Sequence, residues 1–277
     1  MSSASTSGSS MMPEEVMTLL KSGNARFVSA NSAHPRQSRT RLQALAEHGH
    51  HPVATILCSS DSRVPPEILF DQGLGDLFVV RVAGAVVDVD QAASIEYGVD
   101  QLGTPLLVIL GNADCAAVRA VLEESALPGN LPRLLDNMVP AVEEAIKRFP
   151  ELSGEELLPF AVQANVQQSI SDLLEISPLT KQRVMDGLLK IVGAVYDVRS
   201  GSIQWMAPDP QLVRLTPKPK PRPTLKPVES APMPIMIPVS ARPSESVTPA
   251  VPLGPIIPAE PTDLLPTPPV EDGQGGF

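Results

Sequence analysis

Two short polar segments of this 277-residue chain carry the residue types that most readily do chemistry. Residues 58–63 read Cys-Ser-Ser-Asp-Ser-Arg, and residues 111–115 read Gly-Asn-Ala-Asp-Cys. Thiolate and carboxylate are ligands that zinc prefers, and a carboxylate beside a guanidinium can form a bidentate ion pair. Ser59 and Ser62 have no His in their sequence context, so a serine nucleophile activated by His is not indicated. The candidate chemistry is therefore a metal site or an ion pair.

Both segments follow short apolar runs that are typical of buried strands. Strands are predicted at residues 52–57, 77–82, 105–110 and 190–198, with an edge strand at 203–205 after a hairpin-like turn. The helical spacing of apolar residues predicts helices at 13–27, capped by Ser10, and at 37–50, 91–102, 116–122, 131–148 and 159–174. Apolar strands that alternate with helices indicate an α/β fold, a mainly parallel sheet with flanking helices. In such sheets the functional loops lie at the carboxyl ends of the strands, where both polar segments fall.

Composition divides the chain into three regions. Residues 1–12 are rich in Ser and contain no basic residue and no apolar run, so we expect a disordered N-terminus and not a signal peptide. Residues 13–207 hold the predicted elements and form the folded domain. Residues 208–277 contain 19 of the 31 Pro, which predicts a disordered tail because Pro at this density prevents helices and sheets. This Pro-rich tail suits either a spacer or a docking segment for a protein partner.

Composition also excludes several classes of protein. The net charge of −10 argues against binding to nucleic acid or to an anionic membrane surface. Aromatic residues make up only 3% of the chain, too few for a platform on which sugars or bases stack. The longest apolar runs are far shorter than the ~20 residues of a membrane span, and two Cys are too few for a disulfide framework. We therefore expect a cytoplasmic protein.

Five segments, in order along the chain, resemble the β-class carbonic anhydrases. They are CSSDSRVPPE (58–67), DQGLGDLFVVRVAG (71–84), ASIEYGV (93–99), VILGNADCAAV (108–118) and KIVGAVYDVRSG (190–201). The resemblance extends over residues 13–207, and an ordered set of motifs is far more specific than a single short one. It implies a β-carbonic-anhydrase-like fold with an N-terminal helical arm. It also implies homodimers or tetramers in which the N-terminal helices wrap the neighbouring subunit.

The resemblance further implies a zinc site built from the family patterns Cys-x-Asp-x-Arg and His-x-x-Cys. Asp61 and Arg63 match the first pattern, but Ser59 stands where Cys is expected. Cys115 matches the second pattern, but Asn112 stands where His is expected. The family ligand positions are thus Ser59, Asn112 and Cys115, with Asp61 as a fourth ligand or as a partner of the metal-bound water. Only Cys115 is a strong ligand for zinc, so no cofactor is expected.

A rearranged zinc site would use Cys58, Asp61 and Cys115. Cys58 lies one residue early, and successive side chains of a strand face opposite ways, so we expect Cys58 to point into the packing of the sheet. A one-residue bulge would turn it toward the site. No His can replace the missing one from nearby sequence, because all four precede the first strand: His34, His48, His50 and His51.

These residues favour a catalytically inactive carbonic anhydrase homologue, because zinc is what lowers the pKa of water to ~7 in this chemistry. Asp61 and Arg63 would remain as an ion pair that holds the loop, and Ala85, where relatives usually carry Asn, indicates further change around the site. Such a pseudoenzyme would be a scaffold or regulatory protein, in the cytoplasm or in a carboxysome-like, carbon-concentrating compartment. Two alternatives stay open: an active zinc enzyme that hydrates CO2 to bicarbonate with the rearranged site, and a sensor that binds bicarbonate beside Arg63.

Overall fold

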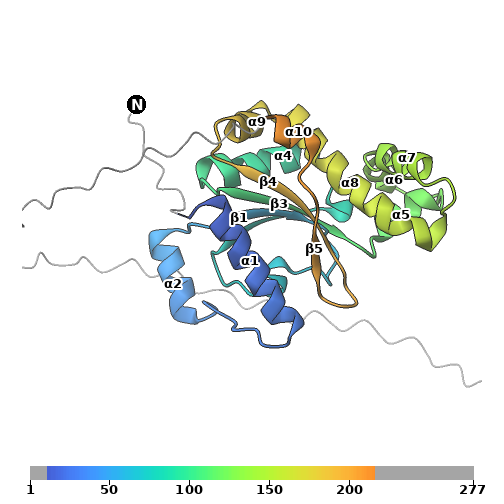
Figure 1. The fold of residues 1–277 in the computed structure, drawn as a ribbon. Coiled ribbons are helices and arrows are strands. Elements are labelled where there is room, and N and C mark those ends of the chain that lie inside the picture. The colour runs from blue at the N-terminus through green and yellow to red at the C-terminus, as the bar shows by residue number, and fades with distance from the viewer. Residues whose placement is uncertain (1–10, 216–277) are drawn as a thin grey trace, which may run out of the picture. The chain divides into compact units, whose positions relative to one another are not determined.

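The computed structural model describes residues 11–215 of the chain (Figure 1). Residues 1–10 of the predicted disordered N-terminus, with the Ser10 cap, and residues 216–277 of the predicted tail lie outside the described residues. The first helix, α1 (Pro13–Val28), begins after Met12, and the Met12 N–H donates a hydrogen bond of 2.7 Å to Oε2 of Glu15. A carboxylate in the first turn thus satisfies a backbone group at the start of the helix.

A five-stranded sheet in the order β2-β1-β3-β4-β5 forms the centre of the described domain. Its strands are β1 (Ala54–Cys58), β2 (Leu77–Arg81), β3 (Leu106–Asn112), β4 (Lys190–Tyr196) and β5 (Ile203–Trp205). The first four are parallel, and β5 runs antiparallel to β4 at the edge. The predicted strands and their mainly parallel arrangement are therefore confirmed. Strands β1 and β3 are buried along their whole length, which explains their continuously apolar sequences.

Helices cover both faces of this sheet (Figure 1). On one face, α1 and the short α3 (Pro66–Leu69) pack against alternate residues of β1, β3 and β4. The other face is covered by α4 (Val89–Glu96), α5 (Ala116–Leu122), α7 (Val139–Arg148) and α8 (Gly154–Ile176). Because successive strand residues point to opposite faces, each strand contributes to both cores.

The N-terminal helices differ in how they use their apolar residues. Val16 and Leu20 of α1 are fully buried against the sheet of their own chain. That the N-terminal helices wrap a neighbouring subunit stays a prediction. In α2 (Arg39–His48) no residue is buried, and Leu42 is 56% exposed. This helix keeps an apolar side chain available for contact with another molecule.

Several helices differ from those that the sequence predicts. The segment 131–148 is divided into α6 (Leu131–Asp136) and α7, because Pro140 in the first turn of α7 favours a new helix start. Helix α8 begins at Gly154, ahead of Pro159, since burial of Leu157 and Leu158 outweighs the cost of a proline in its second turn. The segment predicted as helix 91–102 consists of α4 and a π-helical turn at Tyr97–Gln101.

Three α-helices were not predicted: the short α3 and two that lie later in the chain. Helix α9 (Pro178–Met185) starts after Ser177, whose Oγ accepts a hydrogen bond from the Thr180 N–H. Helix α10 (Pro210–Leu215) lies beyond residue 207, where the predicted tail begins. Leu212 of α10 is 6% exposed and belongs to the same apolar core as residues of α8. Within residues 11–215, no helix combines the length and apolar character needed to cross a membrane.

Candidate functional site

The family ligand positions meet at the carboxyl ends of the neighbouring strands β1 and β3. Ser59 directly follows β1, Asn112 is the last residue of β3, and Cys115 immediately precedes α5. All three residues are buried, with exposed fractions of 5%, 2% and 5%. The two polar segments therefore lie at the same edge of the sheet, as the sequence predicts.

Asp61 and Arg63 form the expected bidentate ion pair. Nε of Arg63 donates a hydrogen bond of 3.0 Å to Oδ1 of Asp61, and Nη2 donates one of 2.7 Å to Oδ2. The Arg63 backbone N–H adds a third hydrogen bond, of 2.9 Å, to Oδ1. The hydrogen bonds from Arg63 hold the pKa of the Asp61 carboxyl below its usual range, against the opposing effect of burial. Asp61 is therefore a carboxylate at neutral pH, already engaged by its neighbour.

A second carboxylate, from Asp114, closes the other side of the same guanidinium. Nη1 of Arg63 donates to Oδ2 of Asp114 at 3.0 Å, and Nη2 of Arg119 donates to Oδ1 of Asp114 at 2.7 Å. Arg119 also pairs with Glu155 of α8. These hydrogen bonds from Arg63 lower the pKa of Asp114, with burial opposing and Arg119 adding to the effect. Every side-chain nitrogen of Arg63 thus donates to a carboxylate of the protein.

The two residues that replace the expected zinc ligands are hydrogen-bonded to protein groups. Nδ2 of Asn112 donates to Oδ2 of Asp61 at 3.0 Å, and Oδ1 of Asn112 accepts from the Asp114 N–H at 3.1 Å. Oγ of Ser59 accepts from the Asp61 N–H at 3.2 Å. The polar side-chain atoms at positions 59 and 112 therefore have hydrogen-bond partners within the site.

Two arginines of the site were not found from the sequence. Arg81, the last residue of β2, donates to the backbone oxygen of Asp61 at 2.7 Å and to that of Ser59 at 3.3 Å. Arg119 of α5 links Asp114 to Glu155, as described above. Neither belongs to a short motif with its partner, and only the register of β2 beside β1 would have indicated the place of Arg81.

The two cysteines belong to opposite faces of the sheet. Cys58 is fully buried among residues of the core beneath α1, including Ile56 and Leu110, while Leu57 faces the other core. The expectation that Cys58 points into the packing of the sheet is confirmed. Burial raises the pKa of the Cys58 thiol to about 12. Cys115 lies in the opposite core, and burial raises the pKa of its thiol as well, against hydrogen bonds from backbone N–H groups.

Two of the three family ligand positions carry donor types that zinc does not prefer. Zinc prefers thiolate, imidazole and carboxylate, whereas Ser59 offers a hydroxyl and Asn112 a carboxamide, so only Cys115 is of a preferred type. In the part of the chain that the structure describes, no three His, Cys, Asp or Glu side chains are grouped so that they could hold a metal ion. All four His precede β1, and His50 and His51 lead into its amino end, at the edge of the sheet opposite the site.

The loop after β2 has a backbone conformation that suits a different residue from the one it carries. Ala85 has φ of 53°, a left-handed conformation that Asn adopts more readily than Ala. Ser169 and Asn165 of α8 hold this loop, donating to the backbone oxygens of Ala85 at 3.0 Å and of Gly84 at 2.7 Å. The resemblance places Asn at position 85 in relatives, so the loop shape fits the family although the side chain has changed.

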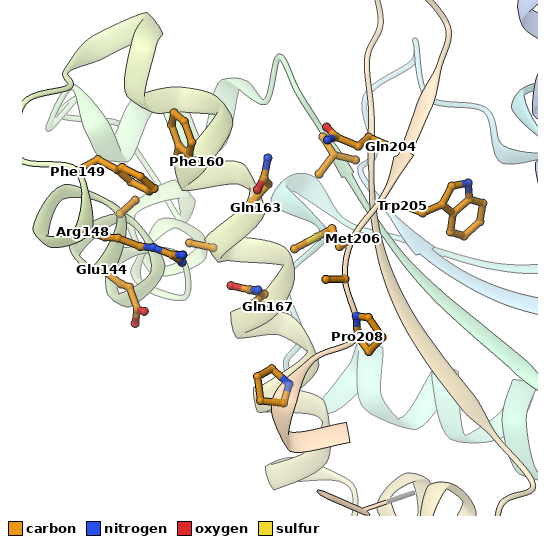
Figure 2. Close-up of a pocket in the computed structure, with 15 residues that line it drawn as sticks. Glu144, Arg148, Phe149, Phe160, Gln163, Gln167, Gln204, Trp205, Met206 and Pro208 are labelled. Atoms are coloured by element: carbon orange, nitrogen blue, oxygen red, sulfur yellow. The ribbon is translucent and has the colours of Figure 1, made fainter. Parts of the chain in front are cut away.

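A pocket of about 550 Å³ lies apart from this site, between α7, α8 and the chain around β5 (Figure 2). The rings of Phe149 and Phe160 lie there with their centroids 4.2 Å apart, and the side chain of Gln163 extends from α8. The Trp205 ring turns away from the pocket and contacts Phe70, at a centroid distance of 6.2 Å. This pocket shares no lining residue with the site at the ends of β1 and β3.

The sheet order, its helical layers and the Asp61–Arg63 pair beside Cys115 define a protein of the carbonic anhydrase class. The carbonic anhydrase family profile matches residues 54–203, and the chain belongs to this family. Carbonic anhydrase 2 of Mycobacterium tuberculosis is 38% identical over 197 residues, which cover 68% of this chain and 90% of that protein. The carbonic anhydrase of Mycolicibacterium smegmatis is 35% identical over 200 residues, covering 69% and 92%.

Solved structures identify the β class. The β-carbonic anhydrase CcaA superposes with a TM-score of 0.55 at 27% identity, over 70% of this chain and 93% of that one. The β-carbonic anhydrase CafA of Aspergillus fumigatus superposes with a TM-score of 0.58 at 25% identity, over 72% and 95%. The fold that the sequence predicts, a β-carbonic-anhydrase-like domain, is therefore confirmed.

Proposed function

We propose that this chain is a catalytically inactive member of the β-carbonic anhydrase family that acts as a scaffold or regulatory protein. The observation that supports it most strongly is the use of Asn112 and Ser59. Both stand at positions of expected zinc ligands, and both are hydrogen-bonded to the backbone or to Asp61. Hydration of CO2 in this family needs a zinc-bound water of lowered pKa. Neither side chain supplies the anionic or imidazole donor that zinc needs.

No other group of the site could take the place of zinc in activating water. Asp61 and Asp114 are held ionised by arginine, and their lowered pKa values make them weak bases at neutral pH. The thiols of Cys58 and Cys115 have raised pKa values and are buried. The site therefore lacks a group that could generate hydroxide from water.

The structure does not favour an active zinc enzyme with a rearranged site. Such a site would join Cys58, Asp61 and Cys115, but the two cysteines belong to different cores on opposite faces of the sheet. Bringing Cys58 to Asp61 would require a bulge at the end of β1, whereas β1 pairs in unbroken register with β2 and β3 through Cys58.

The structure also does not favour a bicarbonate sensor. An anion beside Arg63 needs guanidinium donors, and Nε, Nη1 and Nη2 each already donate a hydrogen bond to Asp61 or Asp114. Bicarbonate would have to compete with these carboxylates, which are covalently part of the protein and therefore present at high effective concentration.

A protein that catalyses no reaction acts through its contacts with other molecules. We infer homodimers or tetramers, as the resemblance implies, and a protein partner that binds the Pro-rich tail. We place this assembly in the cytoplasm or in a carboxysome-like compartment. Matches over about 90% of the two mycobacterial relatives support retention of the whole domain. Sedimentation velocity of the full chain tests the oligomer, and a sedimentation coefficient of a monomer at micromolar concentration would overturn that part.

Stopped-flow CO2 hydration tests the loss of catalysis. The full chain, supplied with equimolar zinc, should hydrate CO2 no faster than buffer, and Cys115→Ser should give the same rate. The Mycobacterium tuberculosis relative serves as the positive control. Hydration above the buffer rate that disappears in Cys115→Ser would overturn the proposal.

A further inference from the structure

Asn112 connects two segments that a zinc ion at the family positions would also connect. It ends β3, while its bonding partner Asp61 lies in the loop that follows β1, 51 residues earlier. We propose that the carboxamide of Asn112 serves as the cross-link between these segments, taking over the structural part of the metal's role. This inference rests on the proposed function, because it requires a site without zinc.

The chemistry of a carboxamide suits this cross-link. Nδ2 donates to Oδ2 of Asp61 at 3.0 Å, and Oδ1 accepts from the Asp114 N–H at 3.1 Å. A carboxylate at position 112 would have no donor for Asp61, and an apolar side chain would have neither group. The residue is 2% exposed, so a lost partner could not be replaced freely by water.

The balance of charge also favours a neutral cross-link. The carboxylates of Asp61 and Asp114 already face the guanidiniums of Arg63 and Arg119. Arg81 lies beside the same loop, where it donates to the Asp61 backbone oxygen. A divalent cation would add positive charge to a site that already contains these arginines. A carboxamide joins β3 to the loop without changing the net charge.

A reciprocal exchange of the two side chains tests this role. In the full chain, Asn112→Asp should place two carboxylates in contact and lower the melting temperature by roughly 5 °C or more, because like charges repel. Asp61→Asn should also lower it. The combined exchange restores an amide-to-carboxylate hydrogen bond in the reverse direction. It should therefore melt above the Asn112→Asp variant, although below the unmodified chain because Arg63 loses a charged acceptor.

Asn31→Asp is the matched control, since Asn31 is exposed and its side-chain Nδ2 donates to Oγ of Ser29, which is also exposed. This change should leave the melting temperature nearly unaltered. If the decreases in melting temperature of the two single variants simply add in the combined exchange, the cross-link is refuted. Should Asn112→Asp not fold, a cycle of Asn112→Ala and Asp61→Ala gives the same test, with a double variant less destabilised than the sum of the two.

The same melts with added zinc and with a chelator separate this inference from the proposed function. The cross-link predicts identical melting temperatures under both conditions. A zinc-dependent rise in the unmodified chain would contradict the proposed function itself. Suppose that zinc and chelator leave the melting temperature unchanged, while the losses of the two single variants simply add in the combined variant. That result would contradict the role of Asn112 alone and leave the proposed function intact.

Discussion

The carboxylate of Asp114 lies 3.0 Å from Nη1 of Arg63, the one guanidinium nitrogen that does not donate to Asp61. The guanidinium is therefore enclosed by two carboxylates, one from each loop at the edge of the sheet. Each of its three nitrogens donates to a carboxylate, although the side chain is 47% exposed and each Nη carries a second N–H group. The carboxylates of Asp61 and Asp114 therefore compete with any small anion for Arg63.

Bicarbonate should consequently not bind with saturation to the unmodified chain. In calorimetric titrations, we expect only heats of dilution, because the carboxylates of Asp61 and Asp114 already neutralise Arg63 and repel a further anion. Asp114→Asn removes one competing charge and should allow weak binding. Saturable binding to the unmodified chain that Arg63→Gln abolishes would instead support the bicarbonate sensor.

Restoring the two family ligands should restore a zinc site. Ser59→Cys combined with Asn112→His completes a set of three strong ligands with Cys115, and Asp61 and Arg63 lie in register beside them. Each single change should bind zinc far more weakly, because two good ligands do not hold the ion. Because burial raises the pKa of the Cys115 thiol, zinc affinity of the double variant should increase with pH.

Equilibrium dialysis of the two single variants and the double variant measures this difference. CO2 hydration need not return in the double variant, since Ala85 indicates further change around the site. A folded double variant that binds no zinc would show that the positions at 59 and 112 are not aligned as the family pattern requires.

Asp71 should make the fold sensitive to acid. It is 3% exposed; burial raises its pKa, but hydrogen bonds from the Ala33 N–H, Arg26 and the His34 N–H outweigh burial and lower it overall. A carboxyl whose pKa is lower in the folded state stabilises the protein above its unfolded pKa of ~3.9. That stabilisation is lost as pH falls through the folded value.

Urea unfolding of the unmodified chain and of Asp71→Asn checks this expectation. Asn tolerates the left-handed backbone at this position, where φ is 47°, so the substitution removes mainly the charge. The variant should lose about 1.5–3 kcal/mol of unfolding free energy at pH 7 and show a shallower loss toward acid. Parallel pH profiles for the two proteins would refute the assignment.

Two C-terminal truncations should differ in melting temperature, although both remove most of the Pro-rich segment. Ending the chain after Leu215 should leave the melting temperature nearly unchanged, because Pro-rich sequence cannot bury enough apolar surface to offset its ordering entropy. Ending it after Ala207 also removes α10 and the buried Leu212, with a loss of about 2 kcal/mol. Equal melting temperatures for the two truncations would show that α10 adds nothing to the core.

The central strands were predictable because they are buried on both sides. Continuous apolar runs identify β1 and β3, and the intervening helical patterns indicate their parallel order. Helix boundaries were less predictable where proline lies inside a helix, as Pro159 does in α8, since tertiary burial offsets the local cost. Helix α10 was missed because composition alone cannot show that Leu212 reaches the core.

Contacts between residues of the site were predictable only where the two residues are close in sequence. The spacing of Asp61 and Arg63 predicts their ion pair, and strand alternation predicts the burial of Cys58. The contacts of Arg63 with Asp114 and of Asn112 with Asp61 join separate loops. Such contacts depend on how β1 and β3 align, which no local pattern specifies.

Zinc content of the purified full chain, measured by inductively coupled plasma mass spectrometry, tests the central claim most directly. Expression in zinc-supplemented medium gives the metal every opportunity to bind. With Ser59 and Asn112 at two ligand positions, we predict well under one zinc per subunit, the same in Cys58→Ser and Cys115→Ser. One zinc per subunit that is lost on Cys115→Ser would contradict an inactive carbonic anhydrase homologue, and loss on Cys58→Ser as well would identify the rearranged site.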